Sequence, residues 1–320
     1  MATDIGYATY RPGRVVRNYR ADLFTTHEWD YDWNRITFDI GLQQVVRFRN
    51  FWRATLTSHI YPATSDDHLT RGGPIAHAPA ARELNLRLNS DPRRRHTVGL
   101  ETDWFWDVAG AHFFSLSPSL TLQPASNLQI ALTPNLVAEH LKAHYVQTTT
   151  DATATSTFGA RYVFAELRRT ELAFETRVNW TFTPTLSLQL YAQPLISANQ
   201  FRDYKELRAP RTYEFAVYGR DEGSIAPNGN GGFTVDPDGA DPAAPFTIAD
   251  QSFNFRSLRA NLVLRWEYRP GATLFLVWQQ NRSNQADGVG DFDFGRDFKS
   301  LRTTPADNVL AIKLSYWMGM

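Results

Sequence analysis

A histidine and a serine lie three positions apart at His112 and Ser115, and together they could supply the base and the nucleophile of a hydrolase. The residues around them alternate between polar and apolar types, which indicates an extended strand. Side chains separated by an odd spacing on a strand point to opposite faces of the sheet. The imidazole and the hydroxyl therefore cannot meet, and we expect no catalytic site here.

Two carboxylates, Glu101 and Asp103, are two positions apart and project to the same face of a strand. Such a pair could divide acid and base roles, but we interpret it as balancing arginines on that face. His59 lies on a polar strand face beside Arg53 and Thr57, where we expect a hydrated or hydrogen-bonded histidine. Because no cluster of His, Ser and Asp converges at one rim, the sequence predicts that the chain is not an enzyme.

Charged residues recur on the polar faces of many predicted strands. If these strands close into a barrel, opposing charges could cross-link its walls or set a field across a narrow passage. We favour a partly occluded lumen, because a barrel of about 12 strands lies between side-chain-filled barrels and wide porins. The predicted lumen-lining residues are Asp39, Arg47, Arg53, His59, Glu83, Arg87, Glu101, Asp103, Glu175, Arg177, Arg259, Arg265, Glu267 and Lys313.

The bulk composition excludes several classes of protein. The 320 residues contain 33 Lys and Arg and 33 Asp and Glu, so the formal net charge is zero. A chain without basic excess is not expected to bind nucleic acid. There is no cysteine, which excludes disulfide scaffolds and cysteine-ligated zinc. We predict no metal and no cofactor, and the N-terminal residues lack the apolar segment of a signal peptide.

The elements that would position these side chains are strands. Apolar and polar residues alternate over 36–43, 52–61, 84–89, 98–106 and 258–268. A period of two predicts strands with one apolar and one polar face. No segment of comparable length shows a helical period, and none approaches the roughly 18 apolar residues of a transmembrane helix. The fold class is therefore predicted to be all-β.

Short and long connections alternate along the chain. In an antiparallel meander, this alternation places short turns at one end and long loops at the other, as in a transmembrane β-barrel with short periplasmic turns and long extracellular loops. The pattern gives about 12 strands, beginning near Arg14. The short connections lie at 47–51, 91–94, 123–126, 182–185 and 269–272, and the long ones at 63–80, 198–250 and 283–306.

Two predicted strands, 127–149 and 159–182, exceed the thickness of a membrane. About 20 residues tilted by roughly 45° rise about 45 Å, whereas the apolar band of such a barrel is about 25 Å tall. Their far halves are expected to form a paired ribbon above the membrane. A short hairpin at 168–170 is the alternative. Segment 198–250 is rich in Gly, Pro and Asp, and we interpret it as having no room for a core.

Aromatic residues gather near predicted strand ends, for example at Trp104, Trp180, Trp266 and Trp317. This placement is typical of the interfacial girdles of membrane barrels. The alternative is a soluble sandwich or lipocalin-like barrel, in which the apolar face would form a sealed core. Alternation alone does not distinguish these two orientations, but the aromatic ends and the segregated loops favour the membrane barrel.

Several segments of the chain resemble one bacterial family. They are TRGGP at Thr70–Pro74, Val163–Ser197, Leu258–Gln280, and GDFDFGRDFKSL followed by PADNVLAIKLSYW. The chain is similar to an uncharacterised outer-membrane β-barrel domain that is found behind a carbohydrate-binding family 9-like module. The resemblance covers roughly Gly6 to Trp317 and depends on the order and spacing of these segments.

This resemblance implies that residues 1–320 are a single outer-membrane β-barrel domain without the signal peptide and sugar-binding-like module that family members carry upstream. It also implies that Gly6–Tyr10 ends a further strand, so that the full-length barrel would have about 14 strands. Barrels of this kind commonly end on an aromatic residue. This chain departs from that pattern, because Met318, Gly319 and Met320 follow Trp317.

The sequence therefore predicts a protein of the cell outer membrane in contact with lipid. Its expected function is a narrow transport channel, or a membrane platform for a sugar-binding-like module. One alternative is a structural barrel whose loops or wall bind another envelope protein. The other is an outer-membrane hydrolase, which needs a catalytic cluster that the residues do not assemble.

Overall fold

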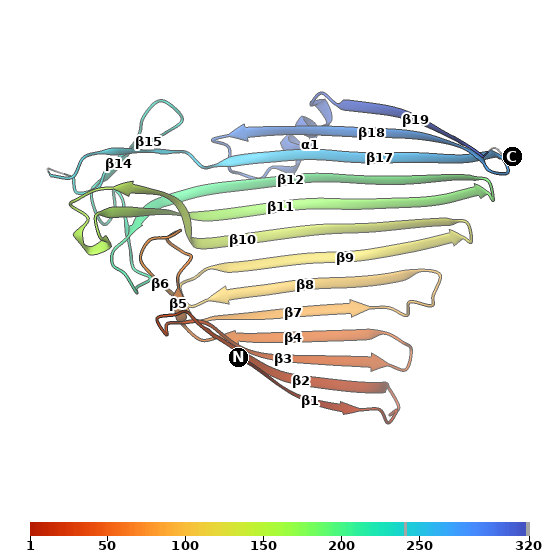
Figure 1. Ribbon diagram of the computed structural model, residues 1–320, viewed down its shortest axis with the longest axis horizontal. Helices are drawn as coiled ribbons and strands as arrows, with labels where there is room; N and C mark the ends of the chain where they lie inside the picture. The colour runs from red at the N-terminus through yellow and green to blue at the C-terminus, as the bar shows by residue number, and fades with distance from the viewer. Residues whose placement is uncertain (240–241, 318–320) are drawn as a thin grey trace.

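The computed structural model describes residues 1–239 and 242–317. Within these residues the chain forms one 14-stranded antiparallel sheet, two small sheets and one α-helix (Figure 1). Each long strand pairs with the long strands that precede and follow it in the chain, so the main sheet is a meander. The predictions of an all-β fold and of an antiparallel meander are confirmed.

Thirteen strands follow one another across the main sheet, and the short strand β13 (Phe215–Val217) pairs with the end of one of them. In spatial order the thirteen are β1 (Ala2–Thr9), β2 (Val16–Trp29), β3 (Arg35–Phe48), β4 (Arg53–Tyr61), β7 (Ala81–Asn89), β8 (Thr97–Asp107), β9 (His112–Ala125), β10 (Leu128–Thr150), β11 (Ala160–Thr183), β12 (Leu186–Leu207), β17 (Phe253–Arg269), β18 (Ala272–Asp287) and β19 (Asp307–Tyr316).

The expected start near Arg14 is therefore wrong, because β1 precedes it and pairs with β2 from Ala2 to Thr9. Only Ile5 and Tyr7 mark an apolar face within β1, and two positions are too few to define a period. Their partners in β2, Leu23 and Ala21, extend that face.

The connections segregate by length, as predicted. The turns β3–β4, β7–β8, β9–β10, β11–β12 and β17–β18 lie at one end of the sheet, which we call the turn end (Figure 1). Gly271 has a φ of 78° in the last of these turns, a conformation that glycine adopts readily. The opposite end, the loop end, carries the long connections. It also carries two short ones that were not expected, at 30–34 and 108–111.

Strands β10 and β11 pair continuously from Leu128 and Trp180 to Thr150 and Ala160. The predicted long strands are thus correct, and the alternative hairpin at 168–170 is wrong. Strand β9 pairs with β10 only as far as His140, so β10 continues past β9 at the loop end, together with β11 and β12 (Figure 1).

A small core forms at the loop end, around β14 (Ser224–Pro227), β15 (Gly232–Asp236) and β16 (Phe246–Ala249). Val235 and Ile248 of this small sheet are buried against Val163 and Ala165 of β11. The interpretation that 198–250 has no room for a core is therefore wrong. The segment supplies Tyr204, Tyr218, Val235 and Ile248, which its glycines and prolines separate in the sequence, and β11 adds Val163 and Ala165.

A second cluster joins Phe164 of β11 to Ala76 and Leu207. Ala76 begins strand β6 (Ala76–Ala78), which pairs with β5 (Thr64–Asp66) in the connection between β4 and β7. The remaining elements are a 3-10 helix at Thr155–Thr157 and helix α1 (Phe294–Thr303). Helix α1 follows β18 and contacts β17 and β18.

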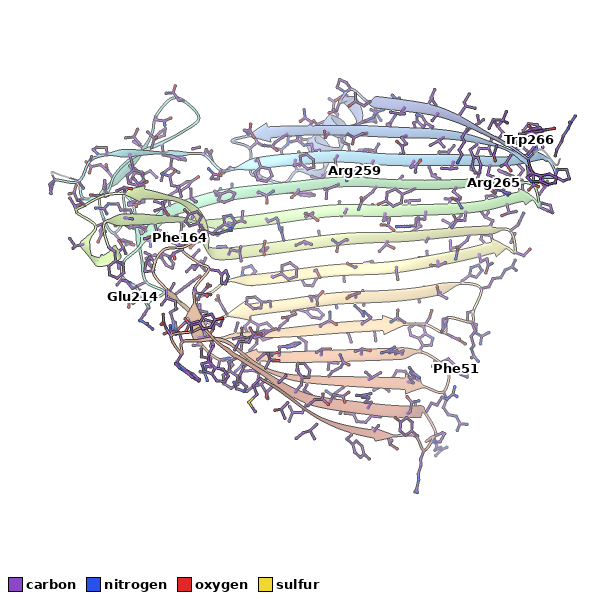
Figure 2. All side chains as sticks on the ribbon, in the orientation of Figure 1. Phe51, Phe164, Glu214, Arg259, Arg265 and Trp266 are labelled. Carbon is purple, nitrogen blue, oxygen red and sulfur yellow. The ribbon has the colours of Figure 1, made fainter. Side chains whose placement is uncertain are left out.

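The apolar face of the main sheet is open to the surroundings. Val98 is 45% exposed, Trp106 44%, Trp180 39% and Trp266 46%. Figure 2 shows Trp266 at the turn end and Phe164 at the loop end. Both buried clusters of the described residues lie at the loop end, and no second sheet covers the apolar face between them and the turn end. This arrangement contradicts the soluble sandwich, which would bury that face.

The two edges of the sheet are β1 and β19. In the described part of the chain, β1 pairs only with β2 and β19 only with β18. Both run from the loop end to the turn end, and their residues are almost all exposed. None of the described helices is long and apolar enough to cross a membrane.

Candidate functional site

The strand register places the whole predicted lumen set on one face of the sheet, which we call the polar face. Directly opposed residues share a face of a sheet. Partners of this kind connect the set from strand to strand: Thr26–Asp39, Arg47–Arg53, His59–Glu83, Arg87–Glu101, Asn85–Asp103, Thr133–Glu175, Ala131–Arg177, Arg177–Tyr191, Gln193–Arg259, Ser187–Arg265, Glu267–Thr273 and Phe275–Lys313.

The carboxylates of the polar face are mostly engaged by neighbours. Arg87 forms an ion pair with Glu101 on the adjacent strand, as the sequence predicted. Asp103 instead accepts hydrogen bonds from the amide of Asn85 and, at 2.9 Å, from the hydroxyl of Ser115. Neutral donors thus hold Asp103, whereas Glu101 forms the direct ion pair with an arginine.

His59 is held by Asp39, by Phe24 and by the ring of Tyr61, which stacks on it with the centroids 5.6 Å apart. Its Nδ1 lies 2.9 Å from Asp39 Oδ1, and the ring of Phe24 packs against it edge-on at 5.5 Å. The Phe24 ring reaches His59 across Gly41, where a Cβ atom would come within 2.1 Å of the ring. The hydrogen-bonded histidine that the sequence favoured is therefore present.

His112 and Ser115 face opposite sides of the sheet, as predicted. His112 is opposed to Trp106 on the apolar face, whereas the Ser115 hydroxyl binds Asp103 on the polar face. Within the described residues, no hydroxyl donates a hydrogen bond to His59 or His112.

One group in the β4–β7 connection brings two carboxylates and a histidine together. Ligand atoms of Asp66, Asp67 and His68 lie within 4.8 Å of one another. Asp66 Oδ1 accepts hydrogen bonds from the backbone N–H groups of His68 and Leu69, both at 2.8 Å. His68 Nδ1 lies 2.5 Å from Asp67 Oδ1. These contacts account for the group as a stabilised turn.

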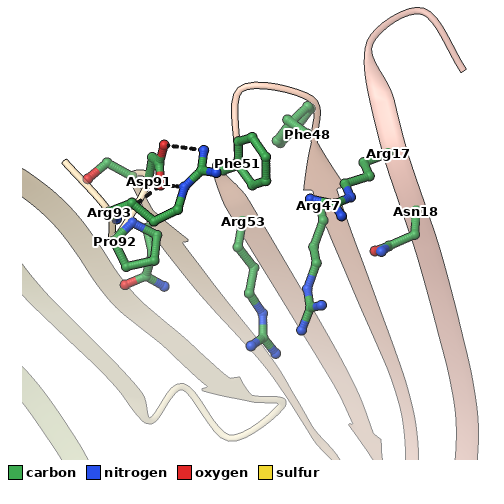
Figure 3. Close-up of a pocket in the computed structure, with 11 residues that line it drawn as sticks. Arg17, Asn18, Arg47, Phe48, Phe51, Arg53, Asp91, Pro92 and Arg93 are labelled. Atoms are coloured by element: carbon green, nitrogen blue, oxygen red, sulfur yellow. Dashed lines mark hydrogen bonds and ion pairs between the residues drawn. The ribbon is translucent and has the colours of Figure 1, made fainter. Parts of the chain in front are cut away.

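A cavity of about 510 Å³ opens at the turn end of β2, β3, β4 and β7, and we call it the arginine pocket (Figure 3). Its lining residues are Arg17, Asn18, Arg47, Phe48, Phe51, Arg53, Asn89, Ser90, Asp91, Pro92 and Arg93. Arg47 and Arg53 are directly opposed across β3 and β4, and their side chains extend next to each other (Figure 3). Asn18 and Asn89 flank them on β2 and β7.

Asp91 is the acidic residue of this lining, and Arg93 engages it. Two hydrogen bonds of 2.8 Å join the guanidinium of Arg93 to the two carboxylate oxygens of Asp91. These bonds are the main reason why the pKa of Asp91 falls to about 2, so that the carboxylate stays charged. The same guanidinium lies over the ring of Phe51, 3.2 Å from its centroid, and Arg17 lies 5.0 Å from that centroid.

Arg17, Arg47 and Arg53 form no ion pair with any described residue. Because these three cations have no anionic partner, the arginine pocket carries an uncompensated positive charge on a chain whose formal net charge is zero. Arg47 and Arg53 also face each other across two strands, and like charges in this position destabilise the pairing. Guanidinium groups in such an arrangement bind carboxylate and phosphate oxygens.

Comparison with known families gives one match over the whole chain. A family described as "Domain of unknown function (DUF5916)" matches residues 1–320. The chain belongs to this family. The resemblance to an uncharacterised family is thereby confirmed, and the upstream sugar-binding-like module stays a prediction.

Among solved structures, the DUF5916 chain is similar to "NanC porin structure in rhombohedral crystal form", at 10% identity over 99% of both chains. The TM-score is 0.24, which is too low to support an argument about this chain. No curated protein matches it.

The sequence placed Arg47 and Arg53 of this DUF5916 chain on the polar face, but it did not bring Arg17, Phe51 and Arg93 to them. A usable signal was present, because basic residues recur in successive short turns, at 47–53 and at 91–95. All such turns lie at the same end of a meander, so their side chains gather there even when they are far apart in the chain.

Proposed function

We propose that this DUF5916 chain is an outer-membrane β-barrel that serves as a narrow transport channel, or as the membrane platform for a sugar-binding-like module. One observation carries the proposal: apart from the part near the loop end where helix α1 packs, the apolar face of a thirteen-stranded meander is left uncovered within the described residues, while charged residues occupy the opposite face. A closed sheet can cross a lipid bilayer because every backbone group finds a partner within it. The uncovered face would contact lipid.

Closure is part of the proposal. Strands β1 and β19 run in the same direction, so a direct seam between them would be parallel. One further strand, running from the turn end to the loop end, would pair antiparallel with both edges. That arrangement gives an even strand number, which is the rule for single-chain bacterial barrels.

A narrow opening is supported by the loop end. The Arg211 side chain, beyond β12, donates a hydrogen bond of 2.6 Å to Asn34, between β2 and β3. The backbone N–H of Arg211 also donates to Ile75 in the β4–β7 connection, at 2.7 Å. These loops connect strands that are far apart in the sheet order. We therefore propose that they span the opening of the barrel at this end and occlude part of the lumen.

Planar-bilayer recording tests the channel. The folded protein, identified by its heat-dependent electrophoretic mobility, is expected to give discrete current steps of small amplitude. Replacing residues 64–78 with a short linker should enlarge these steps, because the segment that carries Ile75 is then absent. A folded wild-type protein without current would contradict the channel and favour the platform, whereas unfolding in lipid would contradict both.

We also propose that the chain is not a hydrolase. His59 binds Asp39, and His112 and Ser115 lie on opposite faces, so these residues offer no base beside a nucleophile. Assays on lipid and peptide substrates are expected to give no turnover above that of the His59→Asn variant. Turnover that depends on His59 would contradict this proposal.

A further inference from the structure

The arginine pocket contains a pair of charges that the protein leaves uncompensated. Arg47 and Arg53 are direct cross-strand partners, and the side chains next to them in the row, Asn18 and Asn89, are neutral. The pocket's own carboxylate, Asp91, is engaged by Arg93. A second hollow, of about 380 Å³, is also lined by Arg47 and Arg53, so these two side chains lie between two open spaces.

The lining fits an anion of limited size. Guanidinium groups present planar forks of donors that match carboxylate and phosphate oxygens. The asparagine amides add neutral donors, and the ring of Phe51 holds Arg93 and Arg17 by cation–π contacts at the rim. A cavity of about 510 Å³ accommodates a small solute and not a folded partner.

The location indicates a soluble anion instead of a lipid headgroup. Arg47 and Arg53 project from the polar face, whereas lipid would contact the opposite, apolar face. In the proposed barrel, the polar face is the lumen wall, and the turn end is one mouth of the lumen. A solute that crosses the lumen would pass these side chains.

We infer that Arg47 and Arg53, assisted by Arg17, form an oxyanion-binding site at the turn-end mouth, where a carboxylate- or phosphate-bearing solute binds. The selectivity that this site confers depends on the proposed channel, but binding to the folded protein does not. The two can therefore be tested separately.

Binding is measured on the folded full chain in detergent, with inorganic phosphate as the probe and ionic strength held constant with potassium chloride. Phosphate is expected to raise the unfolding temperature of the wild-type protein in a saturable manner. The Arg47→Gln/Arg53→Gln variant should bind phosphate at least tenfold more weakly. The Lys299→Gln/Arg302→Gln variant removes the same charge from helix α1, and it should bind like the wild type.

Equal phosphate binding by the two double variants would overturn the inference, as would an absence of binding to the wild type. Both variants are first checked for the folded electrophoretic mobility. If the Arg47/Arg53 variant does not fold, Arg47→Lys/Arg53→Lys replaces it. That variant keeps the charge without the planar fork, and it should weaken binding severalfold.

Selectivity is measured as the reversal potential across a potassium chloride gradient in a zwitterionic bilayer. The wild-type channel is expected to prefer chloride, and the Arg47→Gln/Arg53→Gln variant should shift the permeability ratio severalfold toward potassium. Phosphate binding without any current would leave the inference standing and contradict the channel. Current without phosphate binding would support the channel and overturn the inference of an oxyanion-binding site.

A lipid source is tested by repeating the phosphate titration in anionic vesicles. If the solute assignment is correct, phosphate binds similarly in anionic and zwitterionic vesicles. Displacement of phosphate by the anionic lipid through Arg47 and Arg53 would assign the site to a headgroup and overturn the solute assignment.

Discussion

At the scale of the residue, Arg161 is a buried cation that joins segments of the loop end through ion pairs. Its Nε donates to Asp151 at 2.6 Å and its Nη1 to Glu206 at 2.7 Å, while its side chain is 9% exposed. Glu206 also accepts a hydrogen bond of 2.8 Å from Tyr218, whose pKa is raised mainly by burial. Every charge of this network has a partner, which buried charges require.

Arg161→Gln is expected to destabilise the loop end by about 3–5 kcal/mol, because Asp151 and Glu206 would remain buried without their cation. Hydrogen exchange measures the effect at the loop-end amides of β11 and β12, which lie before Arg168 in β11 and after Gln200 in β12. Arg220→Gln is the control, since Arg220 pairs with Asp221 at the surface. Similar exchange in both variants would show that burial of the Arg161 network contributes little.

At the scale of the element, one buried carboxylate forms the charged attachment of helix α1 to the sheet, beside the buried Leu301 and a hydrogen bond of 2.8 Å from Arg282 of β18 to the backbone carbonyl of Arg302. Asp297 is fully buried and accepts hydrogen bonds from Arg256 of β17 at 2.8 Å and from Asn254 at 3.0 Å. Asp293 caps the helix by accepting from the backbone N–H of Arg296. Phe298 remains 46% exposed beside an apolar hollow that reaches β11 and β12.

Acid should release helix α1. Burial alone would raise the pKa of Asp297, but hydrogen bonds from Arg296, Asn254 and Arg256 outweigh it and lower the pKa to about 2 from 3.8. A carboxylate with a lowered pKa stabilises the fold above its unfolded pKa and loses that effect as the pH falls through the folded one. The helix is therefore expected to detach between about pH 4 and pH 2.

A fluorophore on Lys299→Cys measures this release, because the chain has no other cysteine. Asp297→Asn should detach the helix already at neutral pH, since it leaves Arg256 buried without its partner, at a cost of about 3–5 kcal/mol. Asp291→Asn is the matched control, because the Asp291 side chain is 63% exposed. Wild-type fluorescence from the Asp297 variant would contradict this role of the carboxylate.

At the scale of the whole molecule, the backbone groups along the outer edges of β1 and β19 need hydrogen-bond partners. An unpaired edge in lipid would leave backbone donors and acceptors without partners. The apolar face continues to both edges, through Tyr7 on β1 and Leu310, Ile312 and Leu314 on β19. The distance between β1 and β19 would be about 4.8 Å if they paired directly, and about twice that if one strand lay between them.

Cysteine cross-linking in lipid distinguishes these arrangements. Tyr7→Cys is combined in turn with Leu310→Cys, Ile312→Cys and Leu314→Cys. With a strand between the edges, we expect no disulfide from any of these pairs, because the cysteines would be about 10 Å apart. The control pair, Leu276→Cys with Ile312→Cys, joins direct partners on β18 and β19 and should oxidise. A disulfide from Tyr7→Cys would contradict the additional strand.

The sequence by itself determined most of the long strands and the polarity of their faces, but not β1 or the small sheet at the loop end. Alternation at 258–268 predicted that Arg259, Arg265 and Glu267 share a face, and the register agrees. This information is local, because it depends only on the direction of successive side chains. Arg47 and Arg53 of the candidate site were predicted for the same reason.

The tertiary structure decided which distant residues meet. Arg17 and Arg93 reach the arginine pocket only because β2 and β7 flank β3 and β4. Helix α1 was not predicted: Phe294, Phe298 and Leu301 have helical spacing, but a segment of 10 residues is too short to show that period clearly. Asp297 acquires its role only through Arg256. Pattern within a strand is set by neighbours in the chain, whereas burial and charge compensation are set by contacts between segments that the chain keeps far apart.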